Sequence, residues 1–120
     1  MTTEKTKIID FILEKEKFMR LLSKKSDDYY DHRRKLGDFN FGKRLPGTEK
    51  AVLKSIRTLS NNNGYYFGEW LEDFDIMQGK GLLIDKQGFL FEGWFINNSI
   101  VSGRYIWSDV YTYTGRFTDF

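Results

Sequence analysis

The chain has 120 residues, of which 40% are hydrophobic and 30% charged, a composition typical of one compact globular domain rather than of a disordered segment. It contains no Cys and a single His, which excludes disulfides, thiol nucleophiles and Cys-based zinc sites. The net charge of +2 is unevenly distributed: residues 1–60 carry 15 Lys and Arg against 9 Asp and Glu, whereas residues 61–120 carry 4 against 8. Halves of opposite sign either serve different partners or attract each other.

No apolar run is long enough for a transmembrane helix, and acidic residues such as Asp10 and Glu14 interrupt the apolar positions near the N-terminus. Cleaved secretory and organellar signals lack acids at such positions. We therefore expect an intracellular protein, in a cytoplasmic, cytoskeletal or organellar assembly, without a cleavable signal.

The first half, residues 1–63, is predicted to be a basic helical segment. Apolar residues between Ile8 and Leu22 recur at steps of three and four, which predicts a helix over about residues 4–23. This apolar stripe packs either on the chain's own sheet or on a partner, because one long helix and a small sheet leave little else to cover it.

Capping signals predict two further helices. Ser26 is followed by two aspartates, which favours a helix over about residues 27–36, and Gly37 would end it. Thr48 can cap a third helix over about residues 48–60, with its apolar residues on one face. Gly and Pro between these helices predict a loop over residues 38–47.

The second half, residues 64–120, changes from helical periodicity to aromatic–x–Gly–x–aromatic triplets. The three triplets are Tyr66-Phe67-Gly68-Glu69-Trp70, Phe91-Glu92-Gly93-Trp94-Phe95 and Tyr113-Thr114-Gly115-Arg116-Phe117. Between them lie Gly79-Lys80-Gly81 and Gly103-Arg104-Tyr105. In a strand every second residue shares a face, so each triplet places two aromatics around a glycine gap that a neighbour can enter. Copies of this unit, paired as antiparallel hairpins, would bury a continuous aromatic row.

This pattern resembles the membrane occupation and recognition nexus (MORN) repeats, in which Tyr-x-Gly-x-Trp precedes a Gly-x-Gly strand. The resemblance covers two repeats at about residues 64–87 and 88–109 and the first strand of a third at about 110–120. It implies an α+β fold in which N-terminal helices precede a small antiparallel sheet of stacked MORN-type β-hairpins. The sequence departs from the family at Phe91 and Phe95, which replace Tyr and Trp, and at Tyr105, which replaces a glycine.

The third repeat has no Gly-x-Gly strand before Phe120, so the strand at about residues 111–117 is expected to be unpaired on one edge. Either another subunit completes this hairpin or the chain is a fragment. The resemblance further implies that the repeat residues carry both the stacking and the contact with a partner. These residues are Tyr66, Gly68, Trp70, Gly79, Gly81, Phe91, Gly93, Phe95, Gly103, Tyr113, Gly115 and Phe117.

A second candidate contact is basic. It consists of Arg33, Arg34, Lys35, Lys43 and Arg44, which could bind lipid or nucleic-acid phosphates, or form a solvated face or a contact with an acidic subunit. Because the aromatic half is acidic, the sequence argues against nucleic acid.

Nothing in the sequence nominates a catalytic group, a cofactor or a metal site. His32 lies beside basic residues, which disfavours a ligand or a general base, and Glu72, Asp73 and Asp75 lack the spacing of a calcium loop. We therefore expect a non-enzymatic structural or adaptor subunit that contacts other protein subunits of a larger complex. The alternative is a peripheral module that binds an anionic membrane surface through its basic helices.

Overall fold

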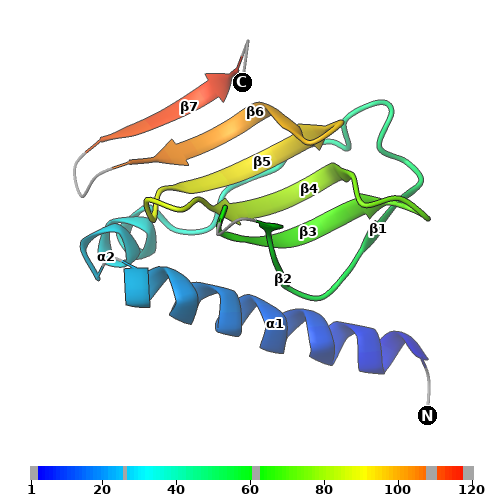
Figure 1. Ribbon diagram of the computed structural model, residues 1–120, viewed down its shortest axis with the longest axis horizontal. Helices are drawn as coiled ribbons and strands as arrows, with labels where there is room; N and C mark the ends of the chain where they lie inside the picture. Colours follow the sequence, from blue (N-terminus) through cyan, green and yellow to red (C-terminus); the bar gives the residue numbers. More distant parts are fainter. Residues whose placement is uncertain (1–2, 26, 61–62, 108–110, 118–120) are drawn as a thin grey trace.

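The computed structural model of the chain describes residues 3–25, 27–60, 63–107 and 111–117, with side chains described from residue 12 onward. Two helices precede a seven-stranded antiparallel sheet (Figure 1), so the expected α+β architecture is confirmed. The elements are α1 (Thr3–Lys25), α2 (Asp27–Leu36), β1 (Ala51–Leu53), β2 (Arg57–Thr58), β3 (Tyr65–Leu71), β4 (Met77–Ile84), β5 (Leu90–Ile96), β6 (Ser99–Ile106) and β7 (Thr112–Arg116).

The helix predicted over residues 48–60 is wrong. This segment instead forms β1 and β2, which both pair with the outer edge of β3, and the Lys54 N–H between them donates to the Gly68 carbonyl at 3.2 Å. Thr48 caps no helix, since its hydroxyl donates to the Leu45 carbonyl within a turn. The apolar spacing of the segment suits a helix, but the edge of β3 offers backbone hydrogen bonds, and tertiary pairing overrides a weak local preference. The loop predicted over residues 38–47 contains neither helix nor strand.

Helix α1 packs on the chain's own sheet through the C-terminal part of its apolar stripe. Phe18 and Leu22 are fully buried against Phe67 and neighbouring strand residues. Ile12 and Leu13, one to two turns earlier, remain 52% and 49% exposed. The apolar stripe was expected to pack either on the chain's own sheet or on a partner. Packing on the sheet accounts for the turns around Phe18 and Leu22, but not for Ile12 and Leu13.

A row of glycines crosses the sheet from β3 to β7. The strands form a meander in which each pairs with the next, and the register aligns Gly68 with Gly81, Gly81 with Gly93, Gly93 with Gly103, and Gly103 with Gly115. The backbones approach so closely that a Cβ built on Gly93 would lie 2.7 Å from the Cα of Gly103. Side chains other than hydrogen therefore do not fit in this row.

Tyrosines lie over the glycine row at both of its ends. The Tyr66 ring covers Gly81, where an added Cβ would come within 2.5 Å of its Cε1 atom, and the Tyr66 hydroxyl donates to the Glu69 carbonyl at 2.8 Å. Tyr113 repeats this arrangement over Gly115, with its hydroxyl donating to the carbonyl three residues later at 2.7 Å. Desolvation raises the pKa of the Tyr66 hydroxyl far above its usual value, so this group remains a hydrogen-bond donor.

The two faces of the sheet bury different kinds of side chain. Helices α1 and α2 lie on one side, which we call the helix face, and cover a mainly aliphatic cluster on the strands (Figure 1). On the opposite side, which we call the aromatic face, Tyr66, Trp70, Phe91, Phe95 and Ile100 bury one another. The glycine row makes this possible, because it provides the space into which the rings on the aromatic face pack.

Replacing Gly93 with Ala tests the close approach. We expect the free energy of unfolding to fall by about 3 kcal/mol or more, because the added Cβ meets backbone atoms that cannot rotate away. Gly37→Ala is the control: nothing lies within 4 Å of its Cβ position, and its φ of +81° leaves only a backbone cost of about 1–2 kcal/mol. Urea denaturation of both variants measures the difference, and equal losses would show that the row is not sterically closed.

Candidate functional site

The predicted repeat residues divide into a buried group and a surface group. Tyr66, Trp70, Phe91 and Phe95 are each at most 7% exposed, and Tyr66 contacts the Trp70 and Phe95 rings edge-on at centroid distances of 5.0 and 5.2 Å. They can stack, but they present no surface to a partner. Tyr113 is 44% exposed, so the predicted partner contact has an accessible residue only toward the C-terminal edge.

Further aromatic residues, which sequence reasoning missed, extend this surface. Tyr105 stacks on Phe91 at 4.2 Å and on Trp107 at 5.1 Å, and Trp107 stacks on Tyr111 at 6.0 Å. Tyr111 is 61% exposed. We call the set on β6, β7 and their flanks the aromatic edge: Tyr105, Trp107, Tyr111, Tyr113 and Phe117. The density of aromatic residues near the C-terminus, Tyr105, Trp107, Tyr111, Tyr113 and Phe117, is the signal that could have indicated it.

Strand β7 presents free backbone groups beside this aromatic edge. In the part of the chain that the structure describes, β7 pairs only with β6. The Phe117 N–H donates to the Val101 carbonyl at 3.0 Å, which makes these two residues a hydrogen-bonded pair. Such pairs alternate along an antiparallel ladder, so the N–H groups of Thr112, Thr114 and Arg116 point away from β6. A further extended segment could pair with them.

Two of the five predicted basic contacts are engaged inside the molecule. Arg33 is buried and contacts Glu92 at 3.1 Å and Asp38 at 2.8 Å, so it is no surface contact. Arg44 holds Glu69 with two hydrogen bonds of 2.9 and 2.8 Å. Arg34, Lys35 and Lys43 are exposed.

Several ion pairs join the basic first half to the acidic second half. They are Arg33 with Glu92, Arg44 with Glu69, and Arg57 with Asp75. The opposite charges of the two halves thus attract each other within the chain. This is the second of the two interpretations of the charge asymmetry, the other being that the halves serve different partners. Asp75 belongs, with Glu72 and Asp73, to the turn between β3 and β4. The described residues contain no group of three or more His, Asp or Glu placed to hold a metal ion.

A buried carboxylate organises the helix face. Glu92 on β5 is 0% exposed and lies between two guanidinium groups, Arg33 of α2 and Arg104 of β6. Arg104 also donates to the Gly37 carbonyl at 2.6 Å, which fixes the end of α2. The network continues to Asp38, whose pKa is lowered by its hydrogen bond with Lys15 and by Arg33. It therefore connects both helices and the loop after α2 to the central strands.

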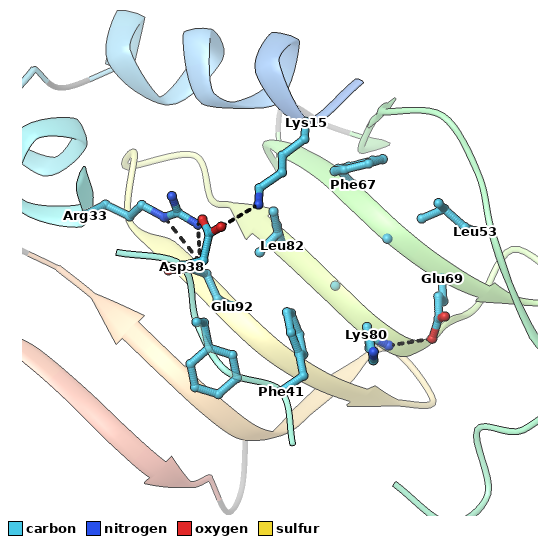
Figure 2. Close-up of a pocket in the computed structure, with 13 residues that line it drawn as sticks. Lys15, Arg33, Asp38, Phe41, Leu53, Phe67, Glu69, Lys80, Leu82 and Glu92 are labelled. Carbon is cyan, nitrogen blue, oxygen red and sulfur yellow. Dashed lines mark hydrogen bonds and ion pairs between the residues drawn. The ribbon is translucent and has the colours of Figure 1, made fainter. Parts of the chain in front are cut away.

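A groove of about 390 Å³ lies between α1 and the helix face of the sheet (Figure 2). The ion network occupies one side of it, and Lys80 and Glu69 lie on the other. Its apolar lining comes from five side chains: Phe39, Phe41, Leu53, Phe67 and Leu82. Sequence reasoning missed this groove because its walls come from separate segments of the chain.

Comparisons with protein-family models, with curated proteins and with solved structures find no match to this chain. Neither helix, within the described residues, is long and apolar enough to cross a lipid bilayer.

Replacing Glu92 with Gln tests the buried network. We expect a loss of about 3–5 kcal/mol in the free energy of unfolding, because Arg104 would remain buried without a counter-charge and Arg33 would keep only the exposed Asp38. The matched control is Asp38→Asn, which removes a carboxylate that is 67% exposed and should cost less than about 1 kcal/mol. Thermal and urea denaturation at neutral pH give both values. A loss for Glu92→Gln as small as that for Asp38→Asn would contradict the assigned role.

Proposed function

We propose that this chain is a non-catalytic structural or adaptor subunit, built on MORN-type hairpins, that binds other protein subunits of a larger assembly. The observation that carries the proposal is the open edge of β7 beside the aromatic edge. Exposed aromatics and unpaired strand backbone are the two features that β-strand addition uses.

The assignment of MORN-type hairpins is supported by the register of the sheet. Each aromatic–x–Gly–x–aromatic triplet contributes its central glycine to the glycine row, and the glycine-marked strands between the triplets contribute theirs. Tyr66 and Tyr113, equivalent in the repeat, make the same hydroxyl-to-carbonyl bond over their glycines. The repetition is therefore one of geometry as well as of sequence.

The partner that fits this edge is an extended protein segment with apolar side chains at alternate positions. Its backbone would pair with the outward N–H groups of Thr112, Thr114 and Arg116, and a side chain that it places on the aromatic face would lie beside Tyr113. Main-chain pairing supplies affinity without demanding a particular sequence, whereas contact with the exposed rings favours apolar residues.

Replacing Thr114 with Pro tests the proposal. Proline removes one outward N–H and is tolerated on an edge strand, so the fold should persist. An added strand would lose one hydrogen bond and would clash with the pyrrolidine ring of the proline. Thr114→Val, which keeps the N–H, is the matched control. We expect proteins that the wild-type chain captures from its native cell extract to be reduced at least tenfold with Thr114→Pro and retained with Thr114→Val, as quantified by mass spectrometry. Capture that is unaffected by proline would remove β7 from the proposal.

The alternative is a module that binds anionic lipid through its helices. The observation that favours it is the exposure of Ile12 and Leu13 on α1, together with exposed Arg34 and Lys35 on α2. Its weakness is that Arg33, the third cation of the cluster, is committed to Glu92.

Liposome flotation with phosphatidylserine vesicles separates the two readings. If the helices bind lipid, the double variant Arg34→Glu/Lys35→Glu should stop flotation, since each basic residue contributes about 1 kcal/mol near an anionic surface. The control Lys50→Glu/Lys86→Glu makes the same change in net charge at exposed positions outside the helices. Our proposal expects no flotation of the wild-type chain, and flotation abolished only by the helix variant would favour the lipid alternative instead.

A further inference from the structure

The groove beneath α1 contains one cation that its surroundings leave uncompensated. The carboxylates in its lining all have cationic partners: Asp38 with Lys15 and Arg33, Glu69 with Arg44, and Glu92 with Arg33 and Arg104. Lys80 also lines the groove. Its backbone N–H donates to Oε1 of Glu69 at 2.8 Å (Figure 2), whereas its Nζ atom has no ion pair or hydrogen bond among the described residues. The site and its immediate partners therefore carry more positive than negative charge.

Two aromatic rings orient this free ammonium group. Nζ of Lys80 lies 5.6 Å from the centroid of the Phe41 ring and 5.7 Å from that of Trp94. Trp94 is itself held in place, because its indole N–H donates to the Phe41 carbonyl at 2.9 Å. Cation–π contacts hold the charge in position but leave its hydrogen-bond donors free.

The sheet register places an apolar surface next to that charge. Phe67 pairs with Leu82, which lies two residues from Lys80 on the same face of β4. Side chains two apart on a strand are separated by about 7 Å. A ligand whose charged end met Lys80 would thus extend its body over Leu82 and Phe67, with Leu53 of β1, which pairs with Glu69, farther along the same face of the sheet.

We propose that this groove binds a small amphipathic monocarboxylate, with the carboxylate on Nζ of Lys80 and the apolar body between Leu53, Phe67 and Leu82. The volume of about 390 Å³ falls at the lower end of the range for small-molecule sites, about 300–1,000 Å³. A single charge suits the site because, among the described residues, Lys80 is the one lining cation without a carboxylate partner, whereas Lys15 and Arg33 are already bound to Asp38 and Glu92. The site is independent of the β7 edge.

Octanoate is the probe, titrated into the full chain by isothermal titration calorimetry. We expect saturable one-to-one binding, at least tenfold weaker binding of the neutral analogue octanamide, and weaker binding of octyl phosphate than of octanoate. Tenfold is the effect of losing one charge-assisted hydrogen bond. Amide chemical shifts should move at Phe67 and Leu82 on addition of octanoate.

Lys80→Met is the decisive variant, because it keeps the stem over the rings and removes only the charge. It should weaken octanoate binding at least tenfold and leave octanamide binding unchanged, whereas the control Lys50→Met, at an exposed position outside the groove, should bind like the wild type. Thr114→Pro should also bind octanoate normally, which separates this inference from the proposed function. No saturable binding, equal binding of octanoate and octanamide, tighter binding of octyl phosphate, or an unaffected Lys80→Met variant would each overturn the proposal.

Discussion

The row of aligned glycines is the constraint on which the rest of the structure depends. Because Gly81, Gly93 and Gly103 lack side chains, neighbouring backbones come close enough that an added Cβ would collide with them or with the Tyr66 ring. The space above the glycine row is then filled by the rings on the aromatic face, such as Tyr66 over Gly81. One face of the sheet can therefore bury its own aromatics without a covering helix.

Because the aromatic face buries its own side chains, both helices can lie on the other face, where apolar packing alone does not fix their positions. Phe18 and Leu22 supply apolar contact for α1, and Tyr29 and Tyr30 of α2 pack against the same cluster. The residue of α2 that is buried is Arg33, which binds Glu92. A buried ion pair is weak as a source of stability, yet it demands one geometry, because each displaced partner leaves a desolvated charge. Glu92 thus fixes where α2 docks more than it stabilises the sheet.

The sequence was sufficient for features that repeat locally and insufficient for those that join distant segments. The triplets around Gly68, Gly93 and Gly115 predicted strands because spacing and face are local properties. The segment 48–60 misled because its apolar spacing fits a helix, and only the open edge of β3 decides otherwise. Glu92 could be recognised as unusual, lying between apolar residues in a strand, but its partner Arg33 is 59 residues away and no spacing rule relates the two.

The two edges of the sheet differ in how far their backbone groups are paired. At the β3 end, the short strands β1 and β2 pair with the outer edge of β3 and Arg44 binds Glu69, so β3 has partners on both sides. At the β7 end, outward N–H groups stand beside half-buried and exposed rings. Among the described residues no strand pairs with the outer edge of β7, and an uncovered edge is a hazard for a free-standing domain, since identical copies can pair along it. Natural sheets usually protect such an edge with charge, proline or a bulge, and β7 offers only Arg116. The asymmetry is physically reasonable if another protein chain covers β7, which is why we place the interaction there rather than on the buried aromatic face.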